Sequence, residues 1–344
     1  MTSYYPPITY IIPEAEDSWL LKTILARRMH VSRKLQSRLK LTEQGIMLNG
    51  QRVYISVKVR TGDVVEIRME KETSDDILPQ PIPFEILYED EHILIVNKEA
   101  GMIVHPTHGH YTGTLANGVV YYWLQKGEAY RFRAVHRLDQ ETTGVLAIAK
   151  NPYVHQHISE QMIHNHVDKK YLAMVHGMPN PQQGEINGPI DRDPEEPHRR
   201  IVTPDGYPSL TKYKVLQSWE QGSLVELKLE TGRTHQIRVH MTSIGCPLIG
   251  DKLYRHPIYH ELAETISSVQ AKEDLQDLLP ENAWQIVLLD DSIPRQALHA
   301  FELSFEHPVT HEKMTFEAPL PEDMAKLQHQ LESGSLTSKY NKES

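Results

Sequence analysis

A polar, proline-rich stretch divides this chain between two regularly patterned regions. Residues 71–83 read KETSDDILPQPIP and include Pro79, Pro81 and Pro83. Proline fixes its own backbone torsion, so this composition is typical of a stiff linker and not of a helix or a strand. The chain has 344 residues, which is too many for one small core and enough for two domains. The sequence therefore predicts a small domain before the linker and a larger domain after it.

The segment before the linker is basic, although the chain as a whole is acidic with a formal net charge of −10. Residues 18–70 contain eleven Lys or Arg and four Asp or Glu, a net charge of +7, which leaves −17 for the rest of the chain. A basic module on an acidic body attracts phosphate groups at one place. Taken alone, the segment fits equally well with a solvated helix that carries Lys and Arg on one face.

Residues 18–70 are expected to form two helices and then short strands. Apolar residues recur with helical spacing from Leu20 to Leu25, and Ser32 can cap a second helix. Asn49-Gly50 predicts a hairpin turn between strands. This order resembles the S-four-type RNA-binding module of a small-subunit ribosomal protein. The resemblance implies a small RNA-binding domain. Residues 1–17, which include Pro6, Pro7 and Pro13, are expected to form an N-terminal extension.

Beyond the linker, residues 84–320 show strands and helices that alternate along the chain. Residues 145–149 (VLAIA) read as a buried strand, and Asn151 can cap the helix that follows. Residues 223–231 (SLVELKLET) alternate apolar and charged side chains, as a strand with one buried face does. A helix is expected from Thr234 onward. Because strands dominate and hairpins are frequent, the predicted fold class is α+β with a largely antiparallel sheet.

Two segments of the larger region differ from the rest in composition. Residues 256–296 contain eight Asp or Glu against two Lys or Arg and have helical character, so we expect an acidic insertion there. Residues 321–344 are expected to form a C-terminal tail that is partly disordered, since the sequence from about Leu331 onward is polar and charged.

The sequence contains no pattern typical of a secreted or membrane-spanning chain. No run approaches the roughly eighteen consecutive apolar residues that a membrane span needs. The N-terminus has no basic region and no small-residue cleavage site. Cys246 is the only cysteine, which excludes an intramolecular disulfide and a metal site built from several cysteines. These features predict a soluble, cytoplasmic protein.

Two stretches gather polar groups at the ends of regular elements. In HRLDQETTG, Asp139 stands in a polar loop that enters a buried strand, where apolar surroundings and a fixed cation can control its ionisation. An isolated Asp before a strand is more often a turn or cap residue. In GRTHQIRVH, Arg238 lies in the first turns of an amphipathic helix, where a partly buried guanidinium needs a carboxylate partner. An Arg–Asp pair that only fixes the fold would explain both stretches.

Five motifs in a fixed order resemble the RluA-type pseudouridine synthase family. They are HRLDQETTG, KKYLAMVHG, GRTHQIRVH, GDKLY and LHAFELSFEHP, within residues 84–320. The resemblance implies the pseudouridine synthase fold, which is a mixed, mostly antiparallel central sheet with the active site in a central cleft. It also implies an isomerase that converts specific uridines in RNA to pseudouridine.

The resemblance implies a role for each of four residues. Asp139 takes the place of the catalytic aspartate, and Tyr171 takes that of the tyrosine that packs against the target uracil. Arg238 matches the arginine that pairs with the catalytic aspartate. Arg137 corresponds to the arginine that enters the RNA where the target base has left.

The implied reaction breaks the C1′–N1 bond, rotates the uracil and joins C5 to C1′ without gain or loss of atoms, so no metal or other cofactor is expected. It requires one desolvated, ionised carboxylate, which Arg238 can maintain. That carboxylate could attack the base, attack the sugar or remove a sugar proton. Two positions depart from the family pattern. Thr143 replaces the usual Ser and keeps its hydroxyl, and Glu99 loosens a turn that we expect to lie away from the chemistry.

The chain has twenty histidines, which invites a metal-site hypothesis. Four of them cluster between residues 155 and 166, but a two-residue offset on a helix points side chains to different faces. We therefore expect these histidines to be solvated or to face RNA. Outside this cluster, His136 and His235 are expected to support Asp139 and Arg238.

Large-subunit ribosomal RNA is the expected substrate, because members of the family with an N-terminal basic module usually act there. Transfer RNA is the second choice. A non-catalytic RNA-binding factor for ribosome assembly is the alternative from a different class, and a metal hydrolase is a third. The GxGxxG and P-loop patterns are absent, so no nucleotide cofactor is expected. The protein is expected to act as a monomer.

Overall fold

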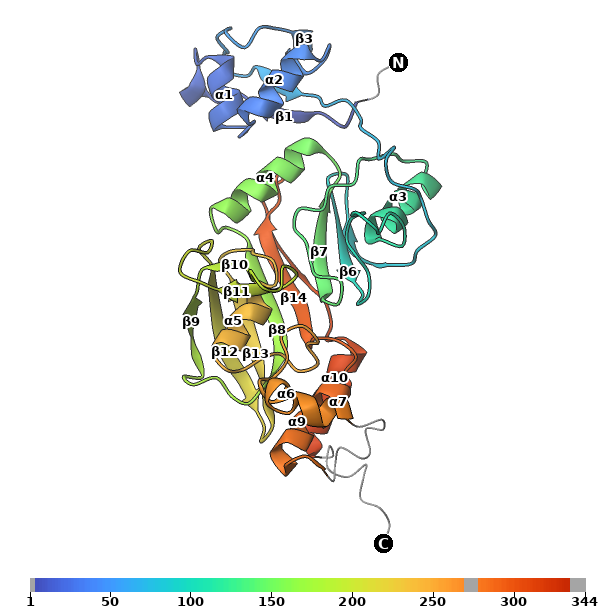
Figure 1. Cartoon of the computed structure of the whole chain (residues 1–344). Coiled ribbons are helices and arrows are strands. Elements are labelled where there is room, and N and C mark those ends of the chain that lie inside the picture. Colours follow the sequence, from blue (N-terminus) through green and yellow to red (C-terminus); the bar gives the residue numbers. More distant parts are fainter. Residues whose placement is uncertain (1–3, 269–277, 335–344) are drawn as a thin grey trace.

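The computed structural model describes residues 4–268 and 278–334 (Figure 1). Its strands form a four-stranded sheet near the N-terminus and a nine-stranded sheet in the remainder of the chain. A separate two-stranded ribbon joins β10 (Ile190–Arg192) to β11 (Arg200–Val202). None of the helices in these residues is long and apolar enough to cross a membrane.

The small N-terminal sheet packs against two helices, α1 (Leu21–Arg27) and α2 (Arg33–Leu41). The Ser32 side chain accepts a hydrogen bond from the backbone of Leu35, so the predicted helix cap is confirmed. Asn49 and Gly50 both adopt positive φ angles in the predicted hairpin turn. In spatial order, the strands are β1 (Ile8–Ile11), β4 (Val64–Ile67), β2 (Ile46–Leu48) and β3 (Gln51–Arg52).

Residues 1–17, predicted as an extension, contribute to this small sheet from residue 8 onward. Strand β1 pairs antiparallel with β4 along its whole length. Tyr5, Ile8 and Ile12 are buried in the same core as the two helices. The boundary predicted at residue 18 is therefore wrong. The four-residue strand β1 belongs to the domain because it pairs with β4, more than fifty residues later in the sequence.

The predicted linker, residues 71–83, has neither helix nor regular strand but lies against the larger domain. Ile77 is buried in that domain's core. The backbone N–H of Phe132 donates to the Ser74 hydroxyl over 2.7 Å, and the backbone N–H of Gln80 donates to the carbonyl of Asn117 over 3.1 Å. The linker is thus fixed at several points on the surface of the larger domain.

The larger sheet is mixed and mostly antiparallel, as predicted. All its pairs are antiparallel except β7 with β14. Strand β15 lies beside β14 as well, so β14 has three neighbours along its length. In spatial order, the strands are β5 (Glu85–Glu89), β6 (Ile93–Lys98), β7 (Thr143–Ala149), β14 (Leu298–Glu306), β8 (Asp168–His176), β13 (Gly222–Leu229), β12 (Leu210–Ser218) and β9 (Gln183–Asn187), with β15 at Lys313–Glu317.

Helices lie on the sheet and at its ends (Figure 1). They include α3 (Leu115–Gln125), α4 (Pro152–Ile163) and α5 (Gln236–Ser243). The Asn151 side chain caps α4 by accepting from the backbone of Val154, as predicted. Figure 1 places the small domain beside α4, and the Gln156 side chain of α4 bonds to the backbone of His30 and Ser32.

The acidic insertion at residues 256–296 is helical where it is described. Its helices are α6 (Ile258–Glu261), α7 (Ala263–Ser268) and α9 (Glu281–Asp291), and residues 269–277 lie outside the described residues. The predicted C-terminal tail is wrong over α10 (Glu322–Ser333), whose Met324, Leu327 and Leu331 are buried. The spacing of three, then four, residues puts these side chains on one helix face. Residues 335–344 lie outside the described residues.

Candidate active site

Asp139 lies where two cavities meet. The larger cavity has a volume of about 1060 Å³ and the smaller one about 790 Å³. Arg137, His235 and Arg238 line both cavities together with Asp139. The two motifs that the sequence singled out, almost one hundred residues apart, are therefore brought to one place.

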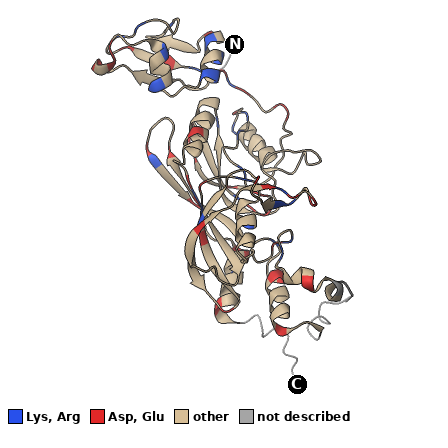
Figure 2. Cartoon of the chain, turned by 60° about the vertical axis from the view of Figure 1, so that its left-hand side comes forward, with Lys and Arg blue, Asp and Glu red and all other residues tan. Residues whose placement is uncertain are grey.

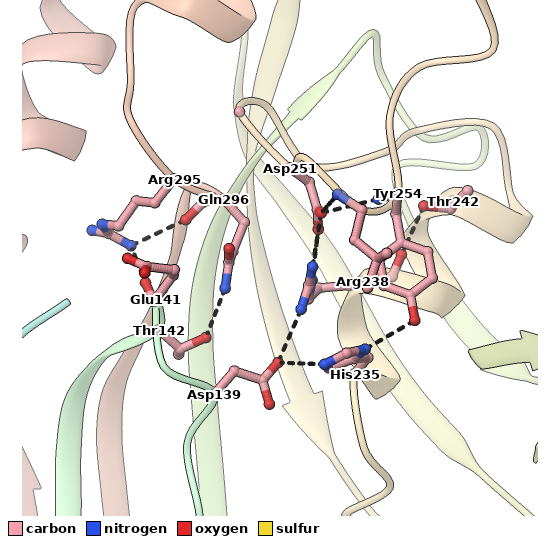
Figure 3. A network of polar contacts seen from close by, with 12 residues as sticks. Asp139, Glu141, Thr142, His235, Arg238, Thr242, Asp251, Tyr254, Arg295 and Gln296 are labelled. Carbon is pink, nitrogen blue, oxygen red and sulfur yellow. Dashed lines mark hydrogen bonds and ion pairs between the residues drawn. The ribbon is translucent and has the colours of Figure 1, made fainter. Parts of the chain in front are cut away.

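The carboxylate of Asp139 faces the guanidinium of Arg238, as Figure 3 shows. Nη1 of Arg238 lies 3.4 Å from Oδ2 of Asp139. Arg238 makes shorter contacts with Asp251, at 2.6 Å from Nε to Oδ2 and 2.8 Å from Nη2 to Oδ1. Arg238 therefore joins two carboxylates, with its fork on Asp251 and its remaining nitrogen directed at Asp139.

Asp251 fixes the orientation of Arg238. Its side chain is fully buried, and Oδ1 also accepts the backbone N–H groups of Leu253 and Tyr254. Burial lowers the pKa of Arg238, but the hydrogen bonds and charge of Asp251 outweigh it and raise that pKa overall. The arginine thus stays charged next to Asp139.

His235 is the second polar group beside Asp139. Its Nε2 lies 3.8 Å from Oδ2 of Asp139, and its Nδ1 lies 2.9 Å from the hydroxyl of Tyr254. His235 has a left-handed backbone (φ 56°) and precedes α5, so the helix begins at Gln236 and not at Thr234 as predicted. Burial lowers the pKa of the His235 imidazole, more than the nearby carboxylates raise it.

Sequence reasoning missed Asp251 and Tyr254, although both belong to the GDKLY motif. Tyr254 is buried, and its ring centroid lies 4.9 Å from the guanidinium carbon of Arg238. Its hydroxyl also accepts the backbone N–H of Arg200 over 2.8 Å. The motif therefore holds both polar partners of Asp139. A carboxylate and an aromatic residue in a short polar motif were the available signal.

Tyr171 comes from β8 and lines the smaller cavity together with Asp139. Only 6% of its surface is exposed. Burial raises the pKa of Tyr171, and the charge of Asp139 raises it further, so its phenol is neutral near neutral pH. A planar, neutral ring on the wall of this cavity can pack against an aromatic base.

Arg137 and His136 differ in their surroundings although they are adjacent. Arg137 is exposed at the edge of both cavities. His136 accepts the backbone N–H of Ala147 through Nε2 over 3.3 Å, and burial lowers the pKa of its imidazole to about 3. The hydrogen bond of His136 thus goes to β7 and not to Asp139, which it was expected to support.

The turn that contains Glu99 is closer to the chemistry than predicted. Nζ of the buried Lys98 donates to the carbonyl of Gln140, the residue after Asp139, over 2.8 Å. The Gln140 amide in turn donates to the carbonyl of Gly101 over 3.1 Å. The expectation that this turn lies away from the chemistry is wrong. The Lys98 side chain connects the turn directly to the residue that follows Asp139, although the two are about forty residues apart in sequence.

The clustered histidines of α4 point to different partners. His155 lines the larger cavity, whereas Nε2 of His157 lies 3.3 Å from the carbonyl of Met29 in the small domain. Among residues 4–268 and 278–334, no group of three or more His, Cys, Asp or Glu is arranged to hold a metal ion.

Comparisons with known proteins agree on one family. A family model described as RNA pseudouridylate synthase matches residues 92–243, which include Asp139, Tyr171 and Arg238. The uncharacterized RNA pseudouridine synthase YlyB of Bacillus subtilis is 39% identical, over 82% of this chain and 84% of the relative. Ribosomal large subunit pseudouridine synthase D of Pseudomonas aeruginosa is 37% identical, over 83% and 81% respectively.

A solved structure supports the fold. Human RNA pseudouridylate synthase domain containing 4 superposes with a TM-score of 0.53 at 23% identity, over 72% of this chain and 93% of that one. This likeness supports the fold, and the sequence relatives show the family. This chain belongs to the RNA pseudouridine synthase family, whose members are isomerases that act on uridines in RNA.

Proposed function

We propose that this protein isomerises specific uridines to pseudouridine in large-subunit ribosomal RNA, with Asp139 as the catalytic carboxylate. The main support for the proposal is that Arg238 contacts both Asp251 and Asp139. Asp251 is buried, and the partly exposed carboxylate of Asp139 faces two cavities. The relatives named ribosomal large subunit pseudouridine synthase D support the choice of RNA.

The reaction would use the difference between the two carboxylates. Asp251 is fully buried and bonded to Arg238, whereas the Asp139 side chain is 31% exposed and has oxygen atoms available to a substrate. The C1′–N1 bond breaks, the uracil turns, and C5 bonds to C1′ while C5 loses a proton and N1 gains one. Attack on the base, attack on the sugar and removal of a sugar proton all require the same ionised carboxylate.

Tyr171 and Arg137 would act on the two sides of the target nucleotide. Tyr171 offers a neutral ring against which uracil can pack inside the smaller cavity. The uridine must leave its helix to reach this cavity, at a cost of roughly a few kcal/mol. Arg137 is exposed at the cavity edge, where its planar guanidinium can occupy the space of the displaced base.

The small domain, which includes β1 as well as residues 18–70, would bind RNA in the manner of an S-four-like module. Figure 2 shows Lys and Arg on its helices and acidic residues on the helices near the C-terminus. Arg33, Lys34 and Lys40 are exposed along α2. Because these basic side chains attract phosphate groups, the RNA backbone would bind at this end of an otherwise acidic molecule.

We place the reaction in the cytoplasm and assign it to a monomer. One chain supplies Asp139, Tyr171 and Arg238 to the same site, so no second copy is required for the chemistry. Mapping pseudouridines in ribosomal RNA from a strain that lacks the protein tests the proposal. At least one large-subunit position should lose its pseudouridine. An unchanged ribosomal RNA with a loss in transfer RNA would contradict the proposed substrate.

A further inference from the structure

A buried arginine lies behind the loop that carries Asp139. This loop, defined here as the catalytic loop, comprises residues 139–143 and leads directly into β7. Arg295 lies between α9 and β14, and its side chain is 2% exposed. A buried guanidinium is costly unless its charge is paired and its N–H groups are bonded. Its partners therefore identify what it stabilises.

Several of these partners belong to the catalytic loop and to β14. Nη1 of Arg295 lies 3.0 Å from the carbonyl oxygen of Glu141 and 3.1 Å from that of Leu298, the first residue of β14. Figure 3 shows Arg295 beside Glu141 and Gln296. Nη2 lies 3.5 Å from the Thr143 hydroxyl, which is itself 2.9 Å from Nδ1 of the buried His299. Arg295 thus ties the loop that follows Asp139 to the neighbouring strand.

The charge of Arg295 is paired by the C-terminal helix. Asp323, the second residue of α10, accepts from Nε over 2.7 Å and from Nη2 over 2.9 Å. This two-pronged geometry is the stronger form of an Arg–carboxylate pair. The three buried apolar side chains of α10 hold the helix against the end of the sheet. Asp323 therefore stands on a fixed element.

We propose that Arg295 and Asp323 are positioning residues through which α10 holds the catalytic loop in its active geometry. The proposal rests on the proposed role of Asp139. Without the Asp323 charge, the guanidinium would be buried and unpaired, so it would turn toward water and release the Glu141 carbonyl. Asp139, two residues earlier, would then leave its place opposite Arg238. A displacement of about 1 Å can lower a rate roughly 10²-fold.

Two substitutions of the full-length protein test this connection. Asp323→Asn removes the counter-charge and keeps the side-chain shape. Arg295→Lys keeps a positive charge, but its single nitrogen cannot occupy the separate positions of Nε, Nη1 and Nη2 that bond Asp323 and the Glu141 carbonyl. Both should lower the single-turnover rate of pseudouridine formation at saturating RNA by about 10- to 100-fold, with less than about a threefold change in RNA affinity. Asp323→Glu retains the carboxylate and should recover most of the rate.

Glu322→Gln is the matched control, because Glu322 precedes Asp323 on α10 and pairs with Lys326 on the exposed face. It should leave rate and affinity unchanged. Hydrogen exchange over residues 139–143 gives a readout that needs no activity, and it should accelerate in Asp323→Asn but not in the control. Wild-type rates and exchange in the two test variants would overturn the proposal, as would a decrease in RNA affinity alone. Failure of the wild-type protein to form pseudouridine would instead refute the proposed function.

Discussion

At the scale of single residues, the site depends on how Arg238 is shared between Asp139 and Asp251. One arginine lies between two carboxylates, and its shortest contacts are with the buried Asp251 and not with Asp139. Asp251 thus sets the position of the guanidinium, and Asp139 remains accessible from the cavities. The charged arginine, held in place by Asp251, thus faces the partly exposed carboxylate at 3.4 Å.

Asp251→Asn should slow the reaction without weakening RNA binding. The substitution keeps the shape of the side chain but removes the charge that orients Arg238, so the guanidinium can move toward Asp139 or toward water. We expect the single-turnover rate to fall at least about tenfold, with little change in KM for RNA. Steady-state and single-turnover assays would measure both. Asp205→Asn, an exposed surface change, is the control and should match wild type. A rate equal to wild type in Asp251→Asn would show that Arg238 does not depend on Asp251.

His136 should make the fold sensitive to acid. Burial lowers the pKa of its imidazole to about 3, whereas in the unfolded chain the pKa is about 6.5. Between these values the unfolded chain binds more protons, so this contribution to stability is fully present above about pH 6.5 and is lost as the pH falls. Relative to His136→Gln, the free energy of unfolding of wild type should drop by about 1 kcal/mol between pH 7.5 and 5.5.

Urea unfolding of both proteins at pH 7.5, 6.5 and 5.5 measures this difference. Comparison with His136→Gln cancels the other histidines, which titrate in both proteins. A stability difference between the two proteins that does not change with pH would show that His136 binds protons equally in the folded and the unfolded state, which would contradict the prediction.

At this scale, the sequence predicted residues that stand inside motifs and missed their partners. Asp139 and Arg238 were singled out because each belongs to a motif that resembles the family, and the fold brings their side chains together. Asp251 escaped notice because a carboxylate in a short loop has no periodic signal, and only the fold brings it to Arg238, thirteen residues earlier on α5. His136 was assigned by proximity in sequence, yet its hydrogen bond goes to the backbone of β7.

At the scale of elements, the parallel pairing of β7 with β14 positions the loop at residues 139–143. These strands form the parallel pair of the sheet, with Gly144 opposite Ala300. Gly144 has a φ of +115°, and a Cβ atom there would lie 2.0 Å from the carbonyl oxygen of Ala300. Only glycine permits this approach, so the loop that ends at Thr143 is fixed by backbone contact as well as by side chains.

Gly144→Ala should therefore lower the free energy of unfolding much more than a glycine-to-alanine substitution at an open site does. We expect a decrease of at least about 3 kcal/mol in the free energy of unfolding, because backbone strain and the clash add. Gly127→Ala is a matched control, since Gly127 also has a positive φ (+71°) but no atom within 4 Å of the added Cβ. It should cost about 1 kcal/mol. Denaturant unfolding measures both, and equal decreases would contradict a role for the close approach.

The sequence predicted central elements better than those at the ends. Strands of the large sheet and the caps of α2 and α4 have strong local signals, and they were confirmed. Strand β1 and helix α10 are short or polar on one face, so their structure depends on distant partners that a local pattern does not contain. The resemblance to a known family supplied the expectation of a mixed sheet, whereas the order of its strands came only from the structure.

At the scale of the whole molecule, charge is separated along its length, with basic helices at one end and acidic helices at the other (Figure 2). The small domain is joined to the larger one through α4 and through Glu72, which pairs with Arg38 of α2 and with Arg133 at the larger cavity. The linker therefore connects the basic domain to the wall of the cavity that contains Asp139.

Reversing the exposed charges of α2 should weaken RNA binding and leave the chemistry intact. The triple variant Arg33→Glu, Lys34→Glu, Lys40→Glu should raise KM for ribosomal RNA. The slope of log affinity against log salt concentration should become shallower by roughly 0.7 to 0.9 for each phosphate that the variant no longer neutralises. The rate at saturating RNA should match wild type.

Binding across a salt series measures this change in slope. Lys313→Glu with Lys326→Glu, at exposed sites outside both cavities, is the control. An unchanged salt slope in the triple variant would show that α2 does not bind the RNA backbone.

The central claim is that the carboxylate of Asp139 carries out the chemistry, and replacement of that one group tests it most directly. Asp139→Asn keeps the shape and the position of the side chain and removes its charge. Glu141→Gln neutralises a second carboxylate of the same loop and is the matched control. With purified protein and large-subunit ribosomal RNA, Asp139→Asn should form no measurable pseudouridine at wild-type RNA affinity, whereas Glu141→Gln should stay within a few-fold of wild type. Pseudouridine formation by Asp139→Asn at a rate comparable to wild type would contradict the claim.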